Sequence, residues 1–158
     1  MTPVDEFTTP EFLDDLKVGL YGKDRWLLLD PFSYVTMVRG YPQAIHVPRF
    51  YVTDLASIPN WARFVIPVND YHRWAAIIHD FLYDSQASHN FTRKEADQIF
   101  QEAMGITPLE AWKCSAMYRA VRLGAGRAWS ANPSRQGLTP NSMLYVGSDI
   151  APKGRYRW

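Results

Sequence analysis

The chain has 158 residues, of which 47% are hydrophobic and 15% aromatic, which excludes a disordered chain and suits one domain with a hydrophobic core. Its 17 Lys and Arg residues against 16 Asp and Glu leave a net charge of +1, which provides no bulk attraction to nucleic acid. Cys114 is the single cysteine, so an intrachain disulfide and a cysteine-cluster metal site are excluded.

The start of the chain, MTPVDEFTTPEF, has no basic region and no apolar run, and we expect no signal peptide. The longest apolar runs are far shorter than a membrane-spanning helix. The chain is therefore expected to be made in the cytoplasm and to stay there unless it leaves inside an assembly.

Residues 16–52 show the pattern of short strands separated by turns. The candidate strands cover 25–29 and 34–38, with a turn-rich break at Asp30–Ser33 between them, and then 44–47 and 49–52. Pro48 indicates an edge or a bend. We expect a small antiparallel sheet that packs on the helices.

The segment from Trp74 to Phe100 predicts two helices joined by a short polar loop. In the first helix, His79 and Tyr83 are one turn apart on one stripe, and Asp80 points about 100° away from His79. The other faces of this helix are apolar, which indicates burial on most sides. A buried Asp80 would need a hydrogen-bond donor or a cation.

The second helix begins at a capping box, Thr92–Glu95. Asp97 borders its apolar stripe, and Arg93 is at the right spacing to pair with it. If the two helices form an antiparallel hairpin, Asp97 comes near His79 or Tyr83, and a carboxylate bonded to an imidazole makes a general base. The alternative is a surface Arg93–Asp97 pair and a core histidine whose hydrogen bonds are satisfied.

Polar residues also gather just upstream, between Thr53 and Pro59. Asp54 and Ser57 can cap turns with their own side chains. In the alternative interpretation, Asp54 lies beside His79 as a second carboxylate. Zinc held by His79, Asp54 and Asp97 would use suitable ligand types, although no HExxH spacing is present.

A further helix is expected from a second capping box, Thr107–Glu110, to about Leu123. One face carries Trp112 and Leu123 and another carries Cys114 and Val121, so we expect the central packing helix of the domain. After Arg127 the composition changes to Asn, Pro, Ser and Gly with several basic residues. Residues 130–158 therefore predict an extended basic arm that contacts a partner or a second copy of the chain; a solvated tail is the alternative.

Several spaced motifs occur in an order shared with a known family. They are Val47-Pro48, Thr53-Asp54-Leu55-Ala56-Ser57-Ile58-Pro59, Ala75-Ala76-Ile77-Ile78-His79-Asp80-Phe81-Leu82-Tyr83, Arg93, Ala96-Asp97-Gln98-Ile99-Phe100 and Ala120-Val121-Arg122. From about Leu27 to Trp129 the chain resembles the phage and prophage family called "domain of unknown function 1353". The resemblance implies a bacteriophage origin, often near virion or tail genes, and no established chemistry. The family usually has a glycine ahead of its TD segment, where this chain has Arg49-Phe50-Tyr51-Val52.

The motif His79-Asp80-x-x-Tyr83, followed by Ala96-Asp97-x-x-Phe100, also resembles the helix pair of phospholipase A2 domains, especially those of parvovirus capsids. By position, this implies that His79 is a general base for water, Asp97 its orienting partner and Asp80 a calcium ligand. Those enzymes use a glycine-rich calcium loop, and here no glycine lies between Gly40 and Gly105. Calcium takes about 6–8 oxygens, so residues 54–59 would have to supply carbonyl ligands.

Taken together, the sequence predicts an α+β domain over residues 1–129, with a small sheet on about three helices, and an arm over 130–158. The function expected first is that of a virion-associated tail or tail-tip protein, which contacts other phage structural proteins or itself through the arm. The alternative is a hydrolase of envelope lipid or cell wall. In that case His79, Asp97 and Tyr83 are the catalytic candidates, Asp80 and Asp54 the candidate ligands of calcium or zinc, and Arg93 and Ser57 the supporting polar network. Nucleic-acid binding would depend on the basic arm alone, and we rank it last.

Overall fold

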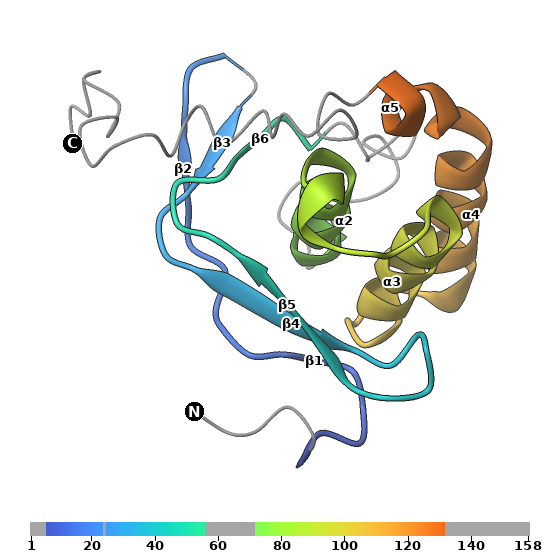
Figure 1. The fold of residues 1–158 in the computed structure, drawn as a ribbon. Coiled ribbons are helices and arrows are strands. Elements are labelled where there is room, and N and C mark those ends of the chain that lie inside the picture. Colours follow the sequence, from blue (N-terminus) through green and yellow to red (C-terminus); the bar gives the residue numbers. More distant parts are fainter. Residues whose placement is uncertain (1–5, 24, 56–71, 132–158) are drawn as a thin grey trace.

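Among the residues that the computed structural model describes, 6–23, 25–55 and 72–131, six short strands form two three-stranded antiparallel sheets (Figure 1). The first sheet has the order β1-β4-β5 and the second β2-β3-β6. The strands are β1 (Glu11–Phe12), β2 (Val18–Leu20), β3 (Trp26–Leu28), β4 (Phe32–Thr36), β5 (Gln43–Val47) and β6 (Val52–Thr53). The fold class is α+β as predicted, with two small sheets in place of one.

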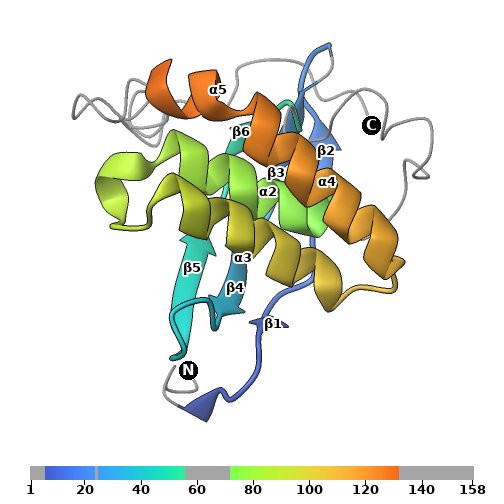
Figure 2. The same cartoon turned by 90° about the vertical axis from the view of Figure 1, so that its right-hand side faces the viewer.

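The helices of the described chain follow the strands in sequence and pack on them in layers. They are α2 (His72–Asp84), α3 (Arg93–Gly105), α4 (Ala111–Gly124) and the short α5 (Gly126–Ala131). α2 lies nearest the sheets, α3 packs beside it, and α4 covers α3 on the outer side (Figures 1 and 2). Within these residues, no helix combines the length and apolar character needed to cross a membrane.

Helix α2 is buried on nearly every side, as its composition predicted. Its apolar side chains Ala75, Ala76, Ile77, Ile78 and Leu82 are at most 1% exposed. Aromatic contacts attach it to the first sheet: the Trp74 ring meets the edge of Phe12 at 5.2 Å and of Phe32 at 5.6 Å between centroids. Polar groups on this helix are therefore enclosed by the core rather than displayed on a surface.

The carboxylate of Glu102 joins α3 to the central strand of the first sheet. Its Oε1 accepts hydrogen bonds from the hydroxyls of Tyr34 (2.9 Å) and Thr36 (2.7 Å), and its Oε2 accepts one from the Met37 amide (3.1 Å). Burial and the nearby Glu102 charge raise the pKa of Tyr34, so its hydroxyl stays a donor. These bonds fix the position of α3 on the sheet.

The capping box predicted at Thr92 is confirmed: the Thr92 hydroxyl accepts from the Glu95 amide, and the Glu95 carboxylate accepts from the Thr92 amide. The capping box predicted at Thr107 is wrong. The Thr107 hydroxyl donates instead to the Met104 carbonyl (2.6 Å) at the end of α3, and α4 begins only at Ala111, with no side-chain cap bond at Glu110. The Thr107 hydroxyl oxygen also accepts from the Leu109 amide at 3.4 Å, but Leu109 lies before the first residue of α4.

The prediction that this helix is central is also wrong. α4 buries Cys114, Met117 and Val121 against the rest of the fold. The opposite face, with Trp112 and Leu123, is the outer one, and these side chains are 57% and 88% exposed. Both faces are partly apolar, so the sequence pattern alone did not show which one faces the core.

The backbone ahead of Thr53 has an unusual conformation at Phe50. Phe50 adopts a φ of 68°, in the left-handed region that glycine occupies at least cost. The conformation is held by a hydrogen bond from the Phe50 amide to the Leu28 carbonyl (2.8 Å), and the Arg49 guanidinium lies 4.6 Å from the centre of the Phe50 ring. These contacts therefore stabilise at Phe50 a left-handed backbone conformation that glycine adopts without steric cost.

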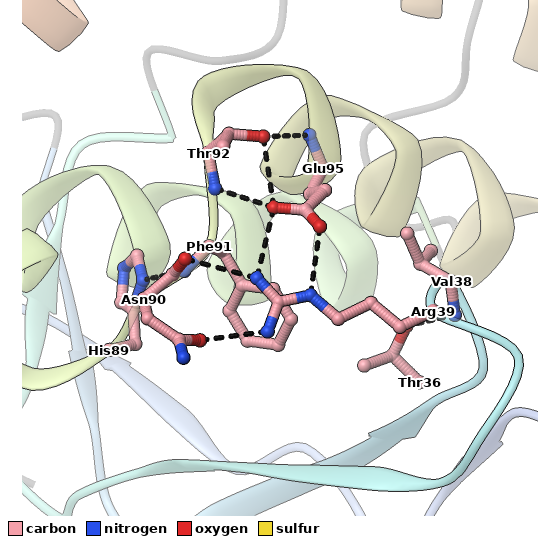
Figure 3. Close-up of polar contacts among 8 residues, drawn as sticks. All are labelled: Thr36, Val38, Arg39, His89, Asn90, Phe91, Thr92 and Glu95. Carbon is pink, nitrogen blue, oxygen red and sulfur yellow. Dashed lines mark hydrogen bonds and ion pairs between the residues drawn. The ribbon is translucent and has the colours of Figure 1, made fainter.

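The turn after β4 is tied to the start of α3 through Arg39 (Figure 3). Its guanidinium forms two bonds to the Glu95 carboxylate, at 2.8 and 3.1 Å, and two to Asn90, at 2.9 and 3.0 Å. It also lies 4.7 Å from the centre of the Phe91 ring. Glu95 therefore caps its own helix and holds a distant turn with the same carboxylate.

This double role predicts a loss of stability in acid. Hydrogen bonds from Arg39, and then from the Thr92 amide, lower the pKa of Glu95 from 4.5 to about 2. Because the folded pKa is the lower one, the stabilisation is complete above pH 4.5 and disappears as the pH falls toward 2. We expect the urea midpoint of unfolding to fall across this range. In Arg39→Met the folded pKa of Glu95 should lie closer to 4.5, so the fall should be smaller, and identical pH profiles for the two proteins would contradict the assignment.

Candidate functional site

Asp97 is the centre of a buried polar network that joins three helices. Its side chain on α3 has no exposed surface. Oδ1 accepts hydrogen bonds from His79 Nε2 (2.8 Å) and from the Tyr83 hydroxyl (2.7 Å), both on α2. Oδ2 accepts from Arg122 Nη1 on α4 at 2.6 Å. The predicted approach of Asp97 to His79 and Tyr83 is therefore confirmed, and both groups reach the same oxygen.

Burial alone would raise the pKa of Asp97, but the hydrogen bonds from His79, Tyr83 and Arg122 together outweigh it, and its pKa lies below the ordinary value. Asp97 is therefore a carboxylate at neutral pH. Burial, followed by the hydrogen bond to Asp97, raises the pKa of Tyr83, so that the tyrosine remains a neutral donor. The Asp97 bond raises the pKa of Arg122, which stays a cation.

The protonation of Asp97 also determines the tautomer of His79. A carboxylate only accepts hydrogen bonds, so His79 Nε2 must carry a proton. In the neutral imidazole the lone pair is then on Nδ1, the arrangement in which a histidine can act as a base. The ring is completely buried and packs against Tyr83 and Phe100, at 4.3 and 4.9 Å between centroids.

Arg93 takes part in the same network mainly through the backbone of α4. Its Nε is 3.8 Å from Asp97 Oδ2, the i,i+4 pair expected from the sequence. Its Nη2 donates to the carbonyls of Val121 (3.3 Å) and Arg122 (2.5 Å), in the last turn of α4. Cations at a helix C-terminus are favourable because the carbonyl dipoles point toward them. Arg93 therefore supports the position of Arg122.

Asp80 and Asp54, the candidate metal ligands, lie near β6 and Tyr51. Asp80 is 9% exposed, and its Oδ2 accepts from the Thr53 hydroxyl of β6 at 2.5 Å. Asp54 is exposed. Tyr51 donates to Asp84 Oδ2 (2.7 Å), and burial first, then the charges of Asp84, Asp80 and Asp54, raise its pKa. Asp54 and Asp80 therefore both act electrostatically on Tyr51.

The metal site predicted at His79, Asp54, Asp80 and Asp97 stays a prediction. Among residues 6–23, 25–55 and 72–131, no group of three or more His, Cys, Asp and Glu side chains has an arrangement that could hold a metal ion. His79 and Asp97 bond to each other, and Asp80 bonds to Thr53. Ser57, assigned to the supporting network, lies outside the described residues, as do residues 132–158 of the arm.

Sequence reasoning missed Arg122 as a partner of Asp97, although its Nη1 lies only 2.6 Å from Asp97 Oδ2. It also missed Thr53 as the partner of Asp80, and Trp129, whose ring meets the edge of Tyr83 at 4.9 Å. Arg122 is 25 residues from Asp97 in the chain, so no local spacing could have indicated the pair. Two signals were available: Arg122 belongs to the quoted motif Ala120-Val121-Arg122, and it is a basic residue in the last turn of α4.

The comparisons with known proteins identify a family but no individual relative or solved structure. A search of curated proteins and a search of solved structures each returned no match. The model of the family described as "Protein of unknown function (DUF1353)" matches residues 26–121, which include the strands from β3 onward, α2, α3 and most of α4. This covers well over half of the chain, together with His79, Tyr83 and Asp97. The chain belongs to the family "Protein of unknown function (DUF1353)".

Proposed function

We propose that this protein is a structural component of a bacteriophage virion, at the tail or its tip, in which the Asp97 network holds the helices in a rigid arrangement. The observation that supports a structural role for the network is the saturation of one buried carboxylate by donors from two other helices. A buried carboxylate that accepts hydrogen bonds from several elements favours one packing of those elements. The proposed virion location is supported by the family resemblance and, for contacts to a partner, by the basic residues after Arg127.

Mass spectrometry of purified particles tests this location. In particles of the phage or prophage that carries the gene, after banding in a density gradient, peptides of this protein should appear in constant ratio to a major tail protein. A deletion of the gene should give particles that lack the tail tip or fail to assemble tails. If the protein is abundant in infected cells but absent from the banded particles, the proposal is wrong.

A second function, hydrolysis with His79 as general base, is favoured by a different observation. The Asp97 carboxylate holds the Nε2 proton of His79 and so directs the lone pair to Nδ1. Tyr83 donates to the same carboxylate oxygen and restrains its direction. The substrate class would be an ester or amide of the host envelope, either lipid or cell wall.

The hydrolase function is tested with phospholipid vesicles and with purified peptidoglycan, by measuring released fatty acid and released fragments. If it is correct, His79→Asn should lower the rate by about 100-fold or more, the contribution typical of general-base catalysis. Tyr83→Phe, which keeps the ring but removes one bond to Asp97, should lose much less. Circular dichroism verifies that both variants fold. An unchanged rate in a folded His79→Asn protein would rule out this function.

A further inference from the structure

The outer face of α4 exposes two large apolar side chains, Trp112 and Leu123. Figure 2 shows this helix crossing the side of the molecule turned toward the viewer. Opposite its buried residues lie Trp112, Ala116, Arg119 and Leu123, at i, i+4, i+7 and i+11, so that they form one straight line along the helix. Trp112 and Leu123 are among the exposed large hydrophobic residues of the described chain. We call these four residues the α4 ridge.

The tryptophan of the α4 ridge is held in place rather than loose. Its indole Nε1 donates to Glu110 Oε2 at 2.6 Å. The Lys113 ammonium lies 5.5 Å from the centre of its ring and 3.4 Å from the same Glu110 oxygen. The ring therefore stays outward with a defined orientation, and little conformational entropy is lost when something covers it.

The charged side chains on α4 itself are all basic, and the acid beside the α4 ridge, Glu110, is paired with Lys113. From Ala111 to Ala131 the sequence contains four basic residues and no acid. Lys113 is paired with Glu110 and Arg122 with Asp97. Arg119 is exposed, and none of the carboxylates in the described residues forms an ion pair with it. A cation with no acid to neutralise it, between two apolar side chains, is complementary to an anionic surface.

We propose that the α4 ridge docks on anionic lipid headgroups, with Trp112 and Leu123 entering the interfacial layer and Arg119 pairing with phosphate. One tryptophan and one leucine are little for the apolar centre of a protein interface. They suit shallow insertion, in which a tryptophan prefers the headgroup layer and cations face it. A convex outer helix can also bring all its aligned side chains onto a flat surface at once. The ridge lies opposite the buried face of α4, so this docking does not require His79 to be catalytic.

Co-sedimentation of the full chain with sucrose-loaded vesicles tests the proposal. Vesicles of equal parts phosphatidylglycerol and phosphatidylcholine should bind the protein, and vesicles of phosphatidylcholine alone should bind it much less. Trp112→Ala should lower the partition coefficient about ten-fold, as expected for removal of a large inserted side chain. Arg119→Gln should lower it about five-fold at low salt, the effect of one basic residue near an anionic surface.

The matched controls are residues of the same kind on the second sheet. Leu20 is 65% exposed on β2, and Leu20→Ser should leave binding unchanged while Leu123→Ser weakens it. Arg25 is exposed in the same sheet region, and Arg25→Gln is the control for Arg119→Gln. Circular dichroism verifies the fold of each variant. Quenching of the tryptophan emission by brominated lipid, lost in Trp112→Phe, provides a second measurement that does not depend on a destabilising change.

Residues 132–158 contain Arg135, Lys153, Arg155 and Arg157 and could bind anionic vesicles by charge alone. In that case binding would disappear in high salt but survive Trp112→Ala and Leu123→Ser, and the proposal would be overturned. It would equally be overturned if the wild-type chain does not bind the anionic vesicles. A protein would then be the occupant to look for on the α4 ridge.

Discussion

Asp97→Asn is expected to lower the free energy of unfolding by about 3–5 kcal/mol, the range for breaking a buried ion pair by removing one partner. The amide has nearly the same shape as the carboxylate, so packing is kept. However, only one of its ends can accept hydrogen bonds. If that end faces His79 and Tyr83, the amide NH₂ faces the Arg122 guanidinium, which lies 2.6 Å from Oδ2 in the wild type. The measurement is urea unfolding at neutral pH, followed by circular dichroism.

The matched control is Asp30→Asn. Asp30 pairs with Lys17 at 2.9 Å, but both side chains are about half exposed or more. Surface pairs of this kind contribute about 0–1 kcal/mol. If Asp97→Asn costs no more than Asp30→Asn, the Asp97 network does not hold the helices together and the structural role proposed for it is wrong.

Arg122→Met is expected to cost about 2–3 kcal/mol at neutral pH and to reduce the part of the acid dependence of stability that comes from Asp97. The loss is smaller than for Asp97 because the guanidinium is itself 32% exposed and the methionine can still pack on α3. Arg122 is one of the donors that lower the pKa of Asp97. Without it the pKa of Asp97 should rise, because burial is then less well opposed.

The effect of pH on stability depends on whether the pKa of Asp97 in the folded protein lies above or below its ordinary value. In the wild type the folded pKa of Asp97 lies below its ordinary value of 3.8, so its stabilisation is complete above that value and is lost as the pH falls through the folded pKa. In Arg122→Met the folded pKa moves toward 3.8, so the loss of stability below that pH should be smaller than in the wild type. Urea unfolding between pH 3 and 7 measures it, and the Asp97 carboxyl can be titrated by NMR.

Arg93→Met is the comparison that separates the two arginines. The Arg93 Nε is 3.8 Å from Asp97, and Nη2 of Arg93 instead bonds to carbonyls at the end of α4. Its loss should lower stability by weakening that helix end, with little change in the acid dependence. If both arginine variants keep the wild-type pH profile, neither cation controls the ionisation of Asp97.

Features that depend on neighbours in the chain could be read from the sequence. The capping box at Thr92 needs only groups three residues apart, and it is present as predicted. The stripe that places Tyr83 one turn after His79 follows from the helical period. Two such helices in a hairpin place Asp97 beside both, and the structure has this arrangement.

Features that depend on how one helix is rotated against another could not be predicted from the sequence. The faces of α4 are both partly apolar, so the pattern did not decide that Met117 is buried and Trp112 exposed. Thr107 could cap either of two helix ends, and packing decided for the end of α3. The bond from Thr53 to Asp80 needed β6 to lie against α2, which no spacing specifies.

The sequence by itself thus determined the two helices that carry His79, Tyr83 and Asp97, and it predicted their contact on the condition that the helices form a hairpin, because hydrogen bonds along a helix and its 3.6-residue period are local. Only the tertiary structure brought Arg122 to Asp97 and turned the α4 ridge outward. An ion pair between residues far apart in the chain depends on how two helices pack, and that choice is made by the whole core. The neutralised, buried carboxylate and the exposed tryptophan are both results of this packing.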